Sequence, residues 1–262
     1  MRWLSLLLLS GVSLFAQLAA PNDAGVSVGH VHLVVADPEA QKKLWVGLLG
    51  GELKPLPPLD LVKFPGILVV LQKARTAPTD GSDGSTVNHF GFLVKSYADI
   101  KAKLASEHLP FTMDNEKTKQ VIAVFPEKIS VEFTEDPNLK TPIAFHHFHV
   151  AAVDQEGTRD WYVKTFSGKA GKRGAFPAAF VPGGEVDFRK ADTAAAPTKG
   201  RSLDHIGFEV RNLEEYCKKL QAEGVTFDTQ YRVIPQLNGL KIAYILDPIG
   251  TRIELTEGFA QY

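Results

Sequence analysis

The strongest constraint on this chain is an internal repeat, in which a histidine followed by a short apolar run occurs four times. The histidines are His30, His89, His147 and His205, which lie 59, 58 and 58 residues apart. The run after each is rich in β-branched and aromatic side chains, which is typical of a strand. An Asp, Ser or Asn stands seven positions after each histidine, and such a residue can cap the first turn of a helix. A fixed period of this kind indicates one structural unit used four times.

Helical patterns follow each expected cap, and three short strand-like runs close each copy. The helical pattern of the second copy, residues 97–111, matches that of the fourth, residues 213–227, and the first and third copies also resemble each other. The order of the copies therefore alternates between two types. This order predicts two domains, each a tandem pair, over residues 26–137 and 143–258.

The first 20 residues have the pattern of a secretory signal peptide. Arg2 precedes a nearly continuous apolar run over residues 4–15, and alanines follow. The run is shorter than the roughly 20 residues that a membrane-spanning helix needs. We therefore expect cleavage between residues 16 and 20, no membrane anchor afterwards, and export to the periplasm or the medium.

Charge and cysteine content exclude several function classes. The 29 basic and 30 acidic side chains give a net charge of -1, whereas nucleic-acid binding needs a basic excess. The single cysteine, Cys217, excludes an internal disulfide, an all-cysteine zinc site and an iron–sulfur cluster. We expect a small-molecule substrate or ligand as partner, and the oligomeric state stays open.

Two glutamates repeat together with the histidines. Glu132 and Glu254 each stand six residues after a proline, between apolar residues of an expected strand. A carboxylate buried in such a place is costly unless it is paired or binds a metal. The third copy has Asp187 in the similar place, whereas the first copy has Val70.

Two neutral imidazoles and one carboxylate can hold a divalent metal and leave positions open for substrate. Such a set suits Fe(II), Mn(II), Zn(II), Ni(II) or Co(II). The sequence offers two sets: His147, His205 and Glu254, and a second one of His30, His89 and Glu132. The alternative is that each is a single polar residue at a strand start that faces water. His32 and His149 lie two residues after His30 and His147, on the same face, so either could be a ligand or support one.

These openings, the strand–Glu endings and the paired copies resemble the vicinal oxygen chelate superfamily of glyoxalase I, bleomycin-resistance proteins and type I extradiol dioxygenases. The resemblance covers residues 26–258. It implies an α+β fold of four βαβββ modules, paired into two glyoxalase-like domains with cup-shaped curved sheets. It also implies metal ligands at His147, His205 and Glu254, with Asp187 as a possible fourth, and the equivalent His30, His89 and Glu132 in the first domain.

Four modules in one chain resemble the layout of the extradiol dioxygenases, whose closing signature is similar to residues 244–254. That likeness gives Tyr244 the role of a hydrogen-bond donor to a substrate oxygen. Two departures are Ala243, which replaces a larger apolar residue, and Asn238, which lies near the place of an expected histidine.

The favoured hypothesis is an exported, divalent-metal-dependent enzyme of the dioxygenase, isomerase or lyase type. It would act on a small substrate with vicinal oxygens, with Asp187 or His149 as the candidate base and Tyr244 orienting the substrate. The alternative is a non-catalytic small-molecule-binding protein of the bleomycin-resistance type. A third possibility is that the first domain keeps its histidines only as structural remnants.

Overall fold

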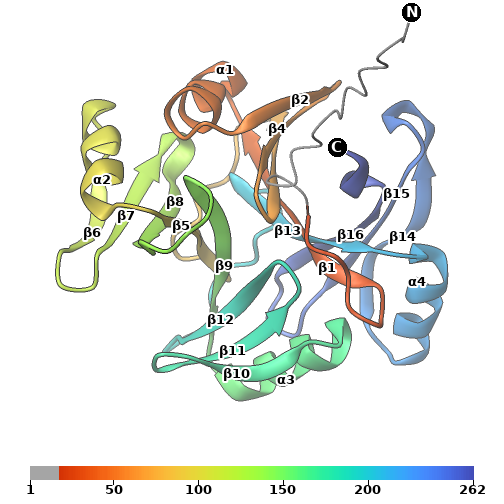
Figure 1. Ribbon diagram of the computed structural model, residues 1–262. Helices are drawn as coiled ribbons and strands as arrows, with labels where there is room; N and C mark the ends of the chain where they lie inside the picture. The colour runs from red at the N-terminus through yellow and green to blue at the C-terminus, as the bar shows by residue number, and fades with distance from the viewer. Residues whose placement is uncertain (1–17) are drawn as a thin grey trace, which may run out of the picture.

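The computed structural model describes residues 18–262, which form four copies of one βαβββ module (Figure 1). Most of the expected signal peptide, residues 1–17, lies outside the described residues. None of the helices within residues 18–262 is long and apolar enough to span a bilayer. The expected α+β class and the four modules are confirmed.

The first two modules end before residue 136. The first contains β1 (Val26–Val35), α1 (Pro38–Lys42) with a π-helical turn (Lys43–Leu48), β2 (Glu52–Leu56), β3 (Leu59–Phe64) and β4 (Ile67–Lys73). The second contains β5 (Val87–Val94), α2 (Tyr97–Ser106), β6 (Phe111–Asn115), β7 (Gln120–Phe125), a 3-10 turn (Pro126–Lys128) and β8 (Ile129–Glu135).

The third and fourth modules repeat this order. The third contains β9 (Ile143–Ala152), α3 (Gln155–Phe166), β10 (Lys169–Arg173), β11 (Phe176–Val181) and β12 (Gly184–Lys190). The fourth contains β13 (Leu203–Val210), α4 (Leu213–Ala222), β14 (Thr226–Ile234), a 3-10 turn (Pro235–Leu237), β15 (Leu240–Leu246), β16 (Arg252–Glu257) and a last 3-10 turn (Phe259–Gln261).

Three of the four expected helix caps form. The side chains of Asp37, Ser96 and Asp154 accept hydrogen bonds from backbone N–H groups in the first turn of their helices. Asn212 does not, because its backbone is left-handed (φ 57°) and its side chain makes no capping bond. The carboxylate of Glu257 accepts from Leu213 N instead, at 2.8 Å.

The modules combine differently from the expected tandem pairs. One eight-stranded sheet has the order β14-β15-β16-β13-β1-β4-β3-β2, and the other has β10-β11-β12-β9-β5-β8-β7-β6. The first module therefore shares a sheet with the fourth, through antiparallel β1 and β13, and the second shares one with the third, through β5 and β9. Each sheet draws one module from each of the segments 26–137 and 143–258. A repeat reveals how many modules exist, but the four opening strands are too alike to reveal their partners.

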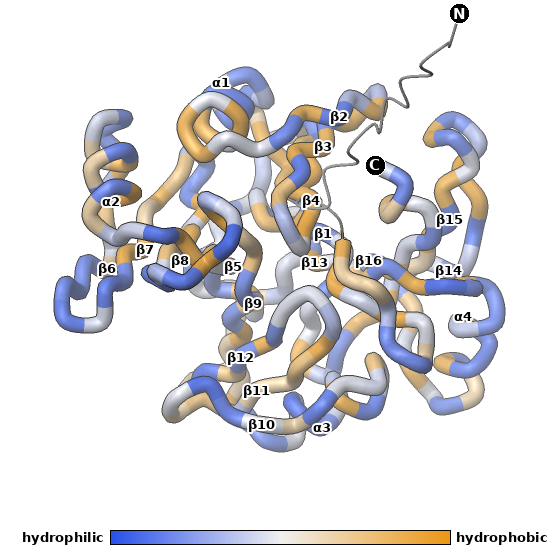
Figure 2. The backbone as a smooth tube through the Cα atoms, in the orientation of Figure 1, coloured by the Kyte–Doolittle hydropathy of each residue, from blue (hydrophilic) through white to orange (hydrophobic). Residues whose placement is uncertain are grey.

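Alternation along the strands separates a main core from the concave faces of the sheets. In β4, Ile67, Val69 and Leu71 belong to the main core, whereas Leu68 and Val70 belong to a second apolar cluster. The helices cover the outer faces of the sheets (Figure 1). In Figure 2 the strands carry runs of hydrophobic residues, and the turns are mostly hydrophilic.

Candidate metal centres

Two imidazoles and one carboxylate meet on the concave face of the first sheet. His30 on β1 and His205 on β13 each place Nε2 2.9 Å from Glu254 Oε2 on β16. Together with His32, they offer four buried ligand atoms that all lie within 4.8 Å of one another. We call this group of His30, His32, His205 and Glu254 the β1–β13 site.

The register of the two central strands explains this convergence. His30 lies opposite Gly207, and His32 lies opposite His205. Because residues two apart share a face of a strand, both β1 histidines point toward the same side. Gly207 makes room for one of them, since a Cβ at that position would lie 2.0 Å from His30 Cε1.

His205 lies between two carboxylates. Its Nδ1 is 2.6 Å from Asp204 Oδ1, and its Nε2 faces Glu254. Burial opposes a charge on this ring, but the hydrogen bonds to Asp204 and Glu254 outweigh it and raise the pKa of His205. With one proton directed to Asp204, the Nε2 lone pair would face the Glu254 carboxylate, so a cation is needed between them. A second proton or a metal ion can supply it.

The other two imidazoles are neutral. Burial lowers the pKa of His30 despite its bond to Glu254, and it lowers the pKa of His32 to about 3. Hydrogen bonds from His205 and His30 hold the pKa of Glu254 well below its usual range, against the effect of burial. Neutral imidazoles and an ionised carboxylate are the protonation states that bind metals. His30, His32 and Glu254 therefore have the protonation states of metal ligands, and a divalent ion would take the place of the Nε2 proton of His205.

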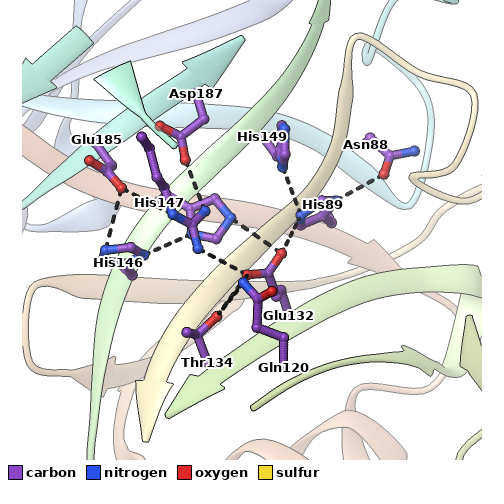
Figure 3. Close-up of polar contacts among 11 residues, drawn as sticks. Asn88, His89, Gln120, Glu132, Thr134, His146, His147, His149, Glu185 and Asp187 are labelled. Atoms are coloured by element: carbon purple, nitrogen blue, oxygen red, sulfur yellow. Dashed lines mark hydrogen bonds and ion pairs between the residues drawn. The ribbon is translucent and has the colours of Figure 1, made fainter. Parts of the chain in front are cut away.

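A second group of the same composition lies on the other sheet (Figure 3). His89 Nε2 on β5 is 3.1 Å from Glu132 Oε2 on β8, and His147 Nε2 on β9 is 3.8 Å from the same oxygen. His149 Nδ1 is 3.1 Å from His89 Nε2. We call the group of His89, Glu132, His147 and His149 the β5–β9 site. Gly91 makes room for His147 here, since an added Cβ would lie 2.3 Å from its Cε1.

Charged residues surround the β5–β9 site in a way that the first site does not share. Asp187 is buried beside it, and burial together with Glu185 raises the pKa of Asp187 to about 7. Arg173 Nη1 is 3.0 Å from Asp187 Oδ2, and its Nη2 is 3.1 Å from Glu132 Oε1. Asp187 does not belong to the four residues whose ligand atoms converge.

Tyr244 lies at the β1–β13 site. It stands directly across from Glu254 on β15, and its ring meets the His205 ring edge-on at 5.1 Å. Burial and the nearby Glu254 raise the pKa of Tyr244 well above its usual value. The tyrosine therefore stays a hydroxyl donor at neutral pH, within reach of the predicted ligands.

The structure regroups the ligand sets that the sequence predicts. His147 lies on the other sheet from His205 and Glu254, and His30 lies on the other sheet from His89 and Glu132. The two histidines His30 and His147 exchange places, because the modules pair first with fourth and second with third. The candidate catalytic residues also divide, with Tyr244 at the β1–β13 site and Asp187 and His149 at the β5–β9 site.

Sequence reasoning missed three features of the sites. The glycines two positions after His89 and His205 distinguish the second and fourth copies from the first and third, which have a histidine there. That contrast could have indicated that unlike copies pair, although both the expected and the observed pairing meet this condition. Arg173 and Phe259, by contrast, carry no signal in the repeat.

Comparison with known proteins agrees with this fold. The sequence model of the Glyoxalase/Bleomycin resistance protein/Dioxygenase superfamily matches residues 144–255. Glyoxalase I from Zea mays is similar in structure, with 15% identity, a TM-score of 0.69, and coverage of 90% of this chain and 94% of that chain. A candidate dioxygenase from Bacillus subtilis has 16% identity, a TM-score of 0.67, and coverage of 94% and 88%. No curated protein matches the chain by sequence. Residues 144–255 therefore match the Glyoxalase/Bleomycin resistance protein/Dioxygenase superfamily by sequence, and the whole chain shares the fold of these solved structures.

Proposed function

We propose that the protein is a divalent-metal-dependent enzyme that acts at the β1–β13 site on a small substrate with two adjacent oxygens. The observation that carries this proposal is the meeting of His30 Nε2 and His205 Nε2 at one oxygen of Glu254, each at 2.9 Å. All three side chains are buried, and their two nitrogens and one oxygen converge as the ligands of a single metal ion do. A divalent ion bound there would act as a Lewis acid on the substrate oxygens.

Neighbouring residues of the chain support such a site. Asp204 accepts from His205 Nδ1 and so turns the Nε2 of that ring toward the site, as the partners of metal-binding histidines commonly do. Tyr244 keeps its proton and can donate a hydrogen bond to a substrate oxygen. His32 Nε2 lies 2.8 Å from Gln72 Oε1, so this nitrogen donates, and Nδ1 is left as a neutral acceptor for a substrate hydroxyl.

The wall beside the site favours a substrate with an apolar body. Eight buried apolar side chains form a separate cluster on this concave face: Leu56, Leu59, Leu61, Leu68, Val70, Leu240, Ile242 and Phe259. Phe259 meets the His30 ring edge-on at 5.1 Å. Apolar contacts would bind the body of the substrate, while the polar groups at the ligands would orient its oxygens.

Elemental analysis of the purified protein tests this proposal. The wild type should bind a divalent metal, and His205→Ala should lose it. His108→Ala is the control, because that histidine belongs to neither group of converging ligands. Absence of bound metal in the wild type after loading, or equal metal in His205→Ala, would contradict the proposal.

A second candidate function is binding without chemistry, which the apolar cluster beside the site favours. A binder of this type would hold an apolar ligand on the concave wall even when metal is removed. Ligand-induced thermal stabilisation that survives chelation would support binding alone. Turnover that depends on added metal would support the enzyme.

We also propose that residues 1–20 direct export, on the sequence pattern of that segment. Sequencing of the N-terminus of protein from the periplasm or the medium should place the first residue after a cut between residues 16 and 20. An intact Met1-Arg2 in that fraction would contradict it. Leu18 packs against the apolar cluster of the β1–β13 site, so a cut at Ala16 would retain this contact, and a cut at Ala20 would remove it.

A further inference from the structure

The two candidate sites share their ligand types but differ in the charges around them. We propose that Arg173 is a built-in counter-ion that keeps a divalent metal out of the β5–β9 site, so that the chain holds one ion, in the β1–β13 site. This inference depends on the proposed function in one respect, namely that the β1–β13 site binds a metal ion.

The guanidinium of Arg173 is surrounded by carboxylates. Its Nη2 is 3.1 Å from Glu132 Oε1, its Nη1 is 3.0 Å from Asp187 Oδ2, and its Nε is 3.5 Å from Glu185 Oε1. The side chain is mostly buried, at 20% exposure, and the three acids are buried with it. An arginine cannot lose its proton in such a place, so the positive charge is permanent.

This charge acts on the residues that a metal would need. Glu132 is the only carboxylate among the four converging ligands of the β5–β9 site, and one of its oxygens is already bound to the guanidinium. Asp187, the possible fourth ligand, is held by the same arginine. A divalent ion would have to bind a carboxylate that already contacts the guanidinium, beside a fixed positive charge at a buried site, where charges interact strongly.

At the β1–β13 site, no arginine within residues 18–262 pairs with the ligand carboxylate, since Arg252 pairs with Asp204 and Asp228 instead. The residue that corresponds to Arg173 is Leu56, because Arg173 pairs with Phe176 at the end of one edge hairpin and Leu56 pairs with Leu59 at the end of the other. Among the ion pairs of residues 18–262, Glu254 contacts only the imidazoles of His30 and His205.

The acids around Arg173 are also missing from the first sheet. Leu61 pairs with Val70 as Ala178 pairs with Asp187, so Val70 corresponds to Asp187 and, two residues earlier, Leu68 corresponds to Glu185. The arginine and its two extra acids therefore occur together on one sheet, and three apolar residues replace them on the other. Arg173 and the acids that hold it are therefore one group, which is present beside the β5–β9 site and replaced by apolar residues beside the β1–β13 site.

Metal stoichiometry tests the proposal on the full-length mature protein. Metal-free protein is loaded with excess Zn²⁺, desalted and analysed for zinc per chain. The wild type should retain one ion, and Arg173→Leu should retain two. Arg173→Lys, which keeps the charge, should retain one, and so should Arg159→Leu, which removes an arginine on α3 that pairs with Glu156 and Asp160.

A double variant locates the additional ion. Adding His89→Ala to Arg173→Leu should return the stoichiometry to one, because His89 belongs to the β5–β9 site. Thermal melting checks that each variant is folded, and Arg173→Gln replaces Arg173→Leu if the leucine variant fails to fold.

Two results would overturn the proposal, and both are distinguishable from a third, which would overturn the proposed function. Two ions in the wild type would show that Arg173 does not exclude metal. One ion in both Arg173→Leu and Arg173→Gln would show that the arginine is not the cause. No ion in the wild type would instead overturn the proposed function at the β1–β13 site.

Discussion

The imidazole of His30 occupies the space that a side chain at position 207 would fill. The two residues lie opposite each other on antiparallel strands from the first and the fourth module, and a Cβ on Gly207 would lie 2.0 Å from His30 Cε1. His147 and Gly91 repeat the relationship on the other sheet. Each site therefore lies where two modules pair, and a glycine on one module leaves the space for the imidazole of the other.

Gly207→Ala should damage the β1–β13 site directly. The added methyl group must displace the His30 ring, and overpacking of this kind costs about 1–3 kcal/mol in the free energy of unfolding. The displaced ring should also weaken metal binding by at least about tenfold, measured by titration of metal-free protein. Gly47→Ala is the control, because a Cβ there meets nothing within 4 Å. Unchanged metal affinity in Gly207→Ala would show that His30 is not a ligand.

Asp204→Asn should weaken metal binding without removing a ligand. The carboxylate of Asp204 fixes the ring of His205 from its far side, and loss of such a partner typically lowers metal affinity 10–100-fold. Asp228→Asn is a matched control, since both aspartates bond to Arg252 and only Asp204 contacts a ligand. Equal losses of affinity in both variants would place the effect in Arg252 rather than in His205.

Much of the fold could be predicted from the sequence, because its repeat is strong. Four histidine-led strands at nearly equal spacing indicate four modules, and the helix caps and the strand–Glu endings follow from local residue chemistry. The prediction that Asn212 caps its helix was wrong, because the carboxylate of Glu257, which is distant in sequence, accepts the hydrogen bond from Leu213 N.

The pairing of the modules could not be predicted in the same way. All four copies share the opening motif, and the pairing depends on contacts between residues that are 49–63 or 170–184 apart in sequence. The candidate ligands were therefore the right residue types, but His30 and His147 were placed in each other's sets. The role of Arg173 could not be predicted, because it lies on an edge hairpin and the other copies have no charged residue at the equivalent position.

Asp247→Asn should remove a pH dependence of stability. Asp247 is buried, and burial raises its pKa to about 6, although it accepts bonds from Thr251 N and Tyr162. The pKa of Asp247 in the folded protein lies above the unfolded value of about 3.9. The protonated carboxyl therefore contributes fully to the free energy of unfolding below about pH 3.9, and this contribution is lost as the pH rises through about 6. The loss amounts to roughly 3 kcal/mol at most.

Urea unfolding between pH 4 and pH 8 measures this effect. The free energy of unfolding of Asp247→Asn relative to the wild type should increase with pH across that window and level off above pH 7. The exposed Asp192→Asn serves as control. A constant difference between Asp247→Asn and the wild type at all pH values would mean that Asp247 does not titrate in this range.

Phe259→Ala should expose the β1–β13 site to solvent, because Phe259 lies on the last 3-10 turn and its ring packs against His30. The Phe259 ring is 2% exposed and covers His30, and Gly258 N–H donates to Glu209 to hold this last turn in place. Removing a buried phenylalanine costs about 3 kcal/mol or more, and a chelator should strip metal from the variant faster. Phe180→Ala, at a position 38% exposed, should change neither quantity. Equal stripping rates in the wild type and Phe259→Ala would mean that metal leaves by another route.

His30→Ala and His147→Ala distinguish the observed grouping of ligands from the one expected for tandem pairs of modules. His30 and His205 approach the same oxygen of Glu254, whereas His147 approaches Glu132 on the other sheet. His30→Ala should therefore lose the metal of the β1–β13 site as completely as His205→Ala does, and the double variant should be no worse than either single one, because both remove the same ion. His147→Ala should keep that ion. Loss of the metal in His147→Ala with retention in His30→Ala would contradict the pairing of the first module with the fourth.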